Sequence, residues 1–261
     1  MPLVVTDACV LHTFDYLDSS RIIRLATRDL GIVSVVARGA RRPRSKFGSA
    51  VDLFAQGVAH VQVKAARDLQ TLVSFDLSSG RSRLSSDLDR FVAASAFVEL
   101  ALRTAHDESH HALFDVITTE LDCIANAAGG LAPVAGLAAC WRLIGELGFS
   151  PALDHCCVCH SKLAPDEQLP FSCQGGGVAC TRCGSSLTAS RLLPAGARAA
   201  IRGWLAPGSS GTGSTSDGLR LSTPELRAHQ RLLREFLVFH VGDDRELRAF
   251  LSWERGAMGG S

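Results

Sequence analysis

The sequence predicts an α+β protein in which a small β-barrel precedes an α-helical domain with an inserted four-cysteine zinc knuckle. Five short apolar, β-branched runs fill the first eighty positions, apolar residues recur at helical spacing from Leu84, and two C-x-x-C doublets follow. We therefore expect a barrel domain at 1–79, a helical domain at 80–150, a zinc knuckle at 151–190, and a C-terminal helical segment at 191–261 that completes the helical domain.

Turn residues separate the five predicted strands. Turns such as Asp18-Ser19-Ser20 and Arg28-Asp29-Leu30-Gly31 interrupt the apolar runs. Five strands in so short a stretch suit a Greek-key barrel of the OB-fold type, although strand count alone also fits an SH3-like barrel. The expected strands are Val4 to Phe14, Ile22 to Thr27, Ile32 to Arg38, Leu53 to Lys64 and Leu69 to Phe75.

The rest of the chain has helical periodicity outside the cysteine-rich region. The first helix starts near Leu84, with Ser85-Ser86-Asp87 as its capping region, and Thr223 with Pro224 begins the last long helix. A Gly/Ser-rich stretch at 207–218 is expected to be a flexible insertion. The other expected helices are 113–127, 131–147, 191–206 and 245–253.

Two cysteine doublets, Cys156-Cys157-Val158-Cys159 and Cys180-Thr181-Arg182-Cys183, are separated by twenty residues. Two tight turns that each offer two thiolates, joined by a hairpin, match the spacing of a tetrahedral zinc site. A closed four-sulfur site has no open coordination position, so it stabilises structure. A redox-active dithiol is the alternative, but it would sit on a single C-x-x-C in a βαβ pattern. We expect one structural Zn²⁺ per chain, bound by Cys156, Cys159, Cys180 and Cys183.

Neighbouring side chains leave some ambiguity in this ligand set. Cys157 and Cys173 are spare thiols nearby, and His155 and His160 flank the first doublet. Cys157 would give the less common C-x-C spacing if it replaced Cys156. Three further cysteines lie in apolar runs and are expected to be small core residues: Cys9, Cys123 and Cys140.

A basic segment lies between the third and fourth predicted strands. No acidic residue occurs between Leu30 and Val51, and Gly39 and Pro43 break the segment. Such a loop can present several cations to a nucleic-acid backbone without reading its sequence, although a run of cations is often only a solvated surface. Phe47 could stack on a base or anchor the loop. The candidate DNA-binding residues are Arg38, Arg41, Arg42, Arg44, Lys46 and Phe47.

A second group of cations lies on the last long helix. Arg227, Arg231 and Arg234 share one helix face. The simpler interpretation is a solvated face that is partly paired with Glu225 or Glu235.

The motifs favour a protein that is not an enzyme. His106 and His110 have the spacing of a zincin helix, but Asp107 stands in place of the catalytic glutamate and the segment reads as a loop. The glycines form no phosphate-binding loop, dinucleotide fingerprint or nucleophile elbow. The sequence shows neither a secretion signal nor a membrane span. We therefore expect a cytoplasmic protein, whose nine cysteines serve a metal site or the core.

The order of barrel, helices, knuckle and helix is accompanied by local similarities. The segments concerned are Ala8 to Tyr16 with Asp18 to Ile23, Val36 to Lys46, Leu143 to Pro151 with the first doublet, and Gly175 to Cys180. Together they resemble the family of the bacterial recombination mediator RecO over about residues 3–240. Two departures are His160, where that family usually has a glycine, and the 207–218 insertion.

The resemblance implies a non-enzymatic protein of DNA repair that binds single- and double-stranded DNA and anneals complementary strands. With its partner RecR, it would help load RecA onto single strands coated by the single-strand binding protein SSB, and it would engage the acidic, apolar SSB C-terminal tail. Such a protein would associate with the nucleoid. The barrel would supply the DNA contact, and an apolar groove with a flanking cation, in the helical region, would hold the tail.

Two other functions fit the same residues. An RNA-binding or ribosome-associated protein could use a similar barrel, and it would prefer single-stranded RNA in competition with DNA. A protein-interaction adaptor could use the basic loop to dock acidic partners, and it would lose nucleic-acid binding at physiological salt.

Overall fold

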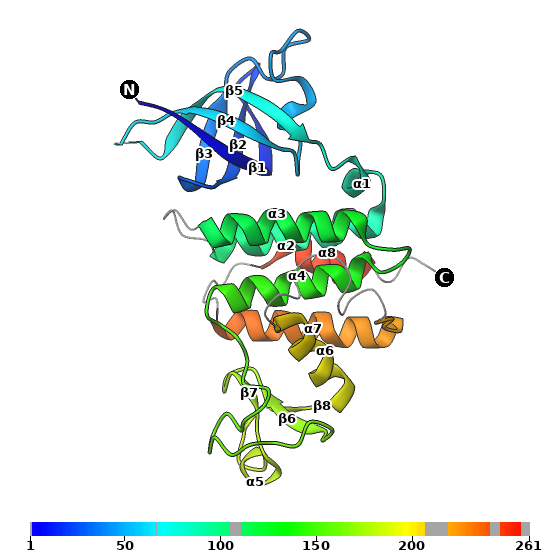
Figure 1. Cartoon of the computed structure of the whole chain (residues 1–261). Coiled ribbons are helices and arrows are strands. Elements are labelled where there is room, and N and C mark those ends of the chain that lie inside the picture. The colour runs from blue at the N-terminus through cyan, green and yellow to red at the C-terminus, as the bar shows by residue number, and fades with distance from the viewer. Residues whose placement is uncertain (1, 66, 105–110, 207–218, 241–245, 257–261) are drawn as a thin grey trace.

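The computed structural model describes residues 2–65, 67–104, 111–206, 219–240 and 246–256. A β-barrel lies on one side of a layer of helices, and a small cysteine-rich knuckle lies on the other (Figure 1). No helix in these ranges is long and apolar enough to cross a membrane. The segment with His106 and His110 and the 207–218 insertion lie outside the described residues.

Five strands form a closed barrel in the order β1-β2-β3-β5-β4, with β1 paired to both β2 and β4. Neighbours are antiparallel except β3 and β5, which pair in parallel. This topology is the one expected of an OB-type barrel, so the predicted fold class is confirmed. The strands are β1 (Leu3–Tyr16), β2 (Ser20–Thr27), β3 (Gly31–Ala37), β4 (Gln56–Gln62) and β5 (Leu69–Ser79).

Along each strand, alternate side chains point into the barrel and fill its interior. Ile23 and Leu25 of β2 and Val35 of β3 are fully buried inside it, while the residues between them point outward. The expected strand from Leu53 begins only at Gln56. A 3₁₀ helix (Gly48–Val51) precedes it, and Phe54 has a left-handed backbone, with φ +69°, that turns its ring out of the barrel and into the core of the helical layer.

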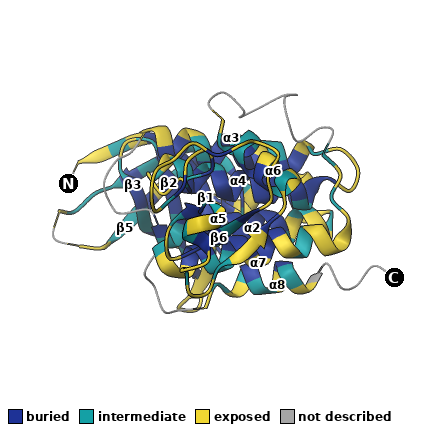
Figure 2. Cartoon of the chain, turned by 90° about the horizontal axis from the view of Figure 1, so that it is seen from below, coloured by how far each residue is buried: buried dark blue, intermediate teal, exposed yellow. Residues whose placement is uncertain are grey.

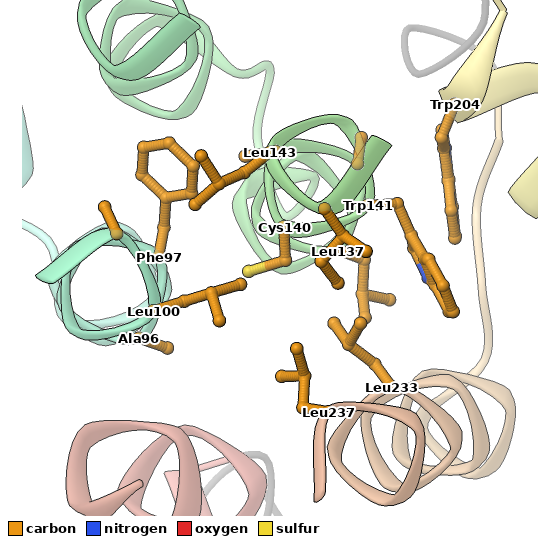
Figure 3. Close-up of a cluster of buried hydrophobic side chains, with 14 of the residues drawn as sticks. Ala96, Phe97, Leu100, Leu137, Cys140, Trp141, Leu143, Trp204, Leu233 and Leu237 are labelled. Atoms are coloured by element: carbon orange, nitrogen blue, oxygen red, sulfur yellow. The ribbon is translucent and has the colours of Figure 1, made fainter. Parts of the chain in front are cut away.

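The helical layer is organised around α4 (Ala132–Glu146), of which nearly every residue is buried. In Figure 3, Trp141 and Leu137 of α4 face α7 (Thr223–His240), and Cys140 faces α2 (Leu88–Thr104). Trp204 of α6 (Ala195–Leu205) lies on the other side of Trp141. The remaining helices are α1 (Ser82–Ser85), α3 (His111–Asn126), α5 (Thr181–Gly184) and α8 (Arg248–Gly256). Figure 2 shows the buried residues gathered in the middle of this layer, behind the largely exposed knuckle loops.

Two predicted helices differ in detail. The helix expected from Leu84 is divided, because α1 ends at Ser85 and the Asp87 carboxylate then accepts the Arg90 backbone N–H at 2.9 Å to start α2. The helix expected at 191–206 begins only after Pro194. Residues 191–193 form β8, which pairs with β6 (Leu169–Ser172) and thereby joins the sheet that also contains β7 (Gly177–Val178).

Arg81 joins the barrel to the helices. Its side chain is 2% exposed and makes an ion pair with Asp122 of α3 at 2.7 Å. It also donates to the backbone carbonyls of Phe54 at 2.9 Å and Thr118 at 3.2 Å, and to the side chain of Gln56. The same residue has a left-handed backbone, with φ +42°. One buried guanidinium therefore connects the end of β5 with the barrel wall and α3.

Helix α8 closes the helical layer against α2. The Glu99 carboxylate of α2 accepts the backbone N–H groups of Arg248, Ala249 and Phe250 at 2.9, 2.8 and 3.2 Å. A carboxylate from another helix thus caps the first turn of α8. Phe250 and Trp253 are buried beneath it.

Candidate metal centre and nucleic-acid surface

The four predicted ligands meet at one point. The Sγ atoms of Cys156, Cys159, Cys180 and Cys183 all lie within 4.8 Å of one another. Zn–S bonds of about 2.3 Å in a tetrahedron place the sulfurs about 3.8 Å apart, and the Cys159 and Cys180 sulfurs are 3.9 Å apart. The donor set and its spacing therefore fit a four-thiolate metal centre.

Backbone N–H groups point at the cluster sulfurs. Cys156 Sγ accepts from the N–H of Cys180 at 3.3 Å and of Val158 at 3.5 Å, and Cys180 Sγ accepts from Cys183 N–H at 3.4 Å. Burial disfavours the thiolate of Cys156, but the backbone donors outweigh it and lower the pKa. The Ser161 hydroxyl and backbone lower the pKa of Cys159 to about 6. These donors stabilise the thiolates of Cys156 and Cys159, the form in which cysteine binds metal, whereas hydrogen bonds with the Cys180 and Cys159 thiols raise the pKa of Cys183.

His160 follows the first cysteine doublet and has a left-handed backbone. Its φ is +58°, a left-handed conformation, and its N–H donates to the Cys156 carbonyl at 2.9 Å. A left-handed backbone suits glycine, so His160 forms this turn at the cost of strain.

The spare thiols lie outside the described cluster of four. Cys173 is buried, and its burial raises the pKa to about 11. Burial also raises the pKa of Cys157. Cys9 and Cys140 are buried as predicted, whereas Cys123 of α3 is half-buried.

The basic loop lies between β3 and β4, at the far end of the molecule from the knuckle (Figure 1). Its five cations are exposed, but they are not equally available. Arg41 Nε lies 3.4 Å from the Asp15 carboxylate, and Lys46 donates to the Val73 carbonyl. Three others have no ion pair among the residues that the structure describes: Arg38, Arg42 and Arg44.

Phe47 is a buried anchor in this structure. It is 2% exposed and packs with the barrel core, so it does not present a face on which a base could stack. Of the two roles left open by the sequence, the geometry favours anchoring. The side chain fixes one end of the loop to the barrel, and Lys46 lies 5.1 Å from its ring centroid.

A groove of about 810 Å³ adjoins the basic loop, and its lining includes residues that sequence reasoning missed. Arg38 and Arg42 line the groove. Tyr16 and Leu17, at the tip of the β1–β2 hairpin, also line it. Tyr16 is 39% exposed, and it provides the aromatic surface that Phe47 does not. Arg67, between β4 and β5, also lines the groove. The predicted hairpin turn at Asp18 was a signal for an exposed tip, but nothing in the sequence placed Arg67 beside it.

The cations of α7 do not form a free basic face. Arg234 pairs with Glu254 of α8 at 2.8 Å, and Arg231 is exposed. Among the described ion pairs, neither Glu225 nor Glu235 is a partner of Arg231 or Arg234. Glu235 pairs with Arg191 of β8, and Glu225 accepts from Ser222 at the start of α7. Arg234 therefore fastens α7 to α8.

Comparison with known proteins agrees with this architecture. The family model "Recombination protein O N terminal" matches residues 1–81, and "Recombination protein O C terminal" matches residues 85–249. The chain is 31% identical over 252 residues to a DNA repair protein RecO of Anaeromyxobacter sp. (strain K), with 96% of each chain covered. It is 30% identical over 261 residues to one of Anaeromyxobacter dehalogenans (strain 2CP-C), with both chains covered completely.

A more distant relative, a DNA repair protein RecO of Bacillus cereus (strain AH187), is 29% identical over 178 residues, which is 67% of this chain and 68% of that protein. The two family models together span the barrel, the helices and the knuckle. The chain therefore belongs to the Recombination protein O family, the family of the DNA repair and recombination mediator RecO.

Proposed function

We propose that this chain is a non-enzymatic, cytoplasmic recombination mediator that binds single- and double-stranded DNA through its barrel and anneals complementary strands. It would work at the nucleoid with RecR to load RecA onto SSB-coated single strands, and it would engage the SSB C-terminal tail. The observation that carries the DNA contact is the position of Arg38, Arg42 and Arg44. All three are exposed, without a described ion pair, beside a groove lined by Tyr16.

The affinity that these three cations can supply is modest. Each phosphate neutralised on a single strand contributes about −0.7 to the slope of log K against log salt, so three give about −2. Arg41 and Lys46 already contact protein groups, so they add less. Replacing the three arginines by Ala would then weaken binding about 500-fold at 50 mM salt and about 30-fold at 200 mM salt.

We also propose that the four-cysteine centre binds one structural Zn²⁺. The support is the donor set, the sulfur spacing and the N–H groups directed at the sulfurs. The ion would hold the two knuckle turns together at the end of the molecule opposite the barrel. Because all four coordination positions are filled by thiolates, the centre would take no part in catalysis.

The test is annealing of complementary strands coated with SSB, followed by fluorescence without nucleotide. Wild-type protein should anneal them in a salt-sensitive way, and the triple variant Arg38→Ala, Arg42→Ala, Arg44→Ala should not. Arg231→Ala removes an exposed arginine on α7, far from the barrel, and should anneal like wild type. Equal annealing by the triple variant would overturn the assignment of the site. If the protein prefers single-stranded RNA in competition with DNA, the proposed ligand is RNA and not DNA.

A further inference from the structure

A second cavity, of about 330 Å³, lies on the outer face of the barrel. Its lining includes Arg24 of β2, Ser34 of β3 and Gln70 of β5. It shares Arg67 and Asp68 with the larger groove beside the basic loop. The two cavities therefore meet at the start of β5.

Arg24 lines this second cavity on the outer face of the barrel and does not point into the barrel interior. The residues on either side of it, Ile23 and Leu25, are fully buried in the barrel core, so Arg24 lies on the outer face, opposite Ser34 in the β2–β3 register. Its Nε is buried without a hydrogen-bond partner. No ion pair of Arg24 occurs among the residues that the structure describes.

Other arginines of the same region do have carboxylate partners. Arg21, three residues earlier on β2, lies 3.6 Å from Asp15 and 3.5 Å from Asp52. Arg28, just after β2, lies 2.7 Å from Asp115. Arg24 is thus a half-buried cation whose charge has no described carboxylate partner, and its planar guanidinium is suited to bind a phosphate.

Arg67 is held at the junction of the cavities by Gln70. The Gln70 side chain accepts the Lys64 backbone N–H at 2.7 Å and donates to the Lys64 carbonyl at 3.2 Å, and it also donates to the Arg67 carbonyl. The turn that carries Arg67 is therefore braced by β5. Arg67 lines both the groove that contains Arg38 and Arg42 and the cavity that contains Arg24.

We propose that Arg24 and Arg67 form a second phosphate subsite, which extends the path of a single strand from the basic loop along the β3–β5 seam. The inference rests on the proposed DNA binding of the basic loop. Ser34, opposite Arg24, is four residues before Arg38, and this separation is about 13 Å along a strand. At the stacked spacing of about 3.4 Å per nucleotide, roughly four nucleotides bridge the two subsites.

Charge in the two cavities favours a phosphate backbone. Arg24, Arg38, Arg42 and Arg67 line them, and Asp68 is the single carboxylate among the lining residues that the structure describes. The contact would be independent of base sequence, because guanidinium groups would bind phosphate oxygens. Asp68 would oppose the strand, so its neutralisation should strengthen binding.

The test is the salt dependence of binding of a twelve-nucleotide single strand, measured by fluorescence anisotropy. Arg24→Ala should reduce the slope by about 0.7 and weaken binding about eightfold at 50 mM salt and about threefold at 200 mM salt. Arg24→Lys should retain most of the slope, and Asp68→Asn should bind more tightly than wild type.

The matched control is Arg255→Ala, which removes an exposed arginine on α8. If Arg24→Ala matches this control on the same strand while the loop triple variant binds weakly, the second subsite is wrong and the proposed function stands. If wild-type protein binds no DNA at 50 mM salt, both are wrong. Circular dichroism of each variant shows whether the barrel is intact.

Discussion

Replacing Arg81 by Ala should destabilise the protein by about 3–5 kcal/mol. The guanidinium is 2% exposed and makes charged hydrogen bonds, each worth about 1.5–3 kcal/mol net. Asp122 is 54% exposed and regains water when its partner is lost, so its part of the cost is small. The carbonyl of buried Phe54 loses its strong donor, which costs about 1–3 kcal/mol more. Such a loss is a large fraction of a typical total stability.

Urea unfolding followed by two signals would measure this loss. The three tryptophans, Trp141, Trp204 and Trp253, all lie in the helical layer, whereas far-UV circular dichroism also reports the barrel. Because Arg81 connects the two, the signals should separate in the variant. Arg81→Gly should lose about 1 kcal/mol less than Arg81→Ala, since glycine tolerates the left-handed backbone.

The matched control is Arg83→Ala. Arg83 is an exposed arginine on α1 that reaches the same helix, α3, with a 3.2 Å hydrogen bond to Asn126. Exposed contacts of this kind contribute less than about 1 kcal/mol. If Arg81→Ala costs no more than Arg83→Ala, the buried guanidinium does not hold the barrel to the helices, and the reasoning is refuted.

Three further predictions concern the knuckle and the helical core. Cys156→Ser should lose the zinc and lower the thermal midpoint, while Cys157→Ser, outside the cluster, should keep one zinc per chain in elemental analysis; equal zinc contents would contradict the assignment. His160→Gly should stabilise the protein by about 0.5–1 kcal/mol in urea unfolding, and a loss would mean that the imidazole makes a needed contact. Burial lowers the pKa of His229 to about 4. Between pH 6.5 and pH 4 the unfolded chain therefore binds a proton at this residue and the folded chain does not. Stability should therefore fall by about 3 kcal/mol from pH 6.5 to pH 4, and His229→Gln should remove that slope.

The barrel and the main helices could be predicted because local patterns define them. Alternation and turns gave the five strands, and 3.6-residue periodicity gave the helices, as at α7. The predicted element bounds are wrong where contacts with a segment distant in the sequence determine the local structure. Phe54 belongs to the core of the helices, so β4 starts later than its apolar run. Residues 191–193 form β8 because β6 offers an open edge, a pairing that no local window contains.

The candidate sites divide in the same way. The clustering of the four cysteines was predictable because two tight turns set the position of each pair of sulfurs. The groove was not, since Tyr16, Arg38 and Arg67 come from three separate turns of the barrel. The parallel pairing of β3 with β5 brings these turns together across more than thirty residues of chain. Arg24 could not be predicted as a site residue, because a single arginine within a strand forms no sequence motif.

The capping of α8 by Glu99 has a consequence for synthesis of the protein. The two partners are about 150 residues apart in the chain. At about 5–20 residues per second, α2 leaves the ribosome roughly 8–30 s before α8. The barrel, complete within its first eighty residues, can form during translation. The site that Phe250 and Trp253 occupy in the helical core stays unfilled until α8 has been made. The helical layer therefore exposes apolar surface on the nascent chain until α8 packs against α2.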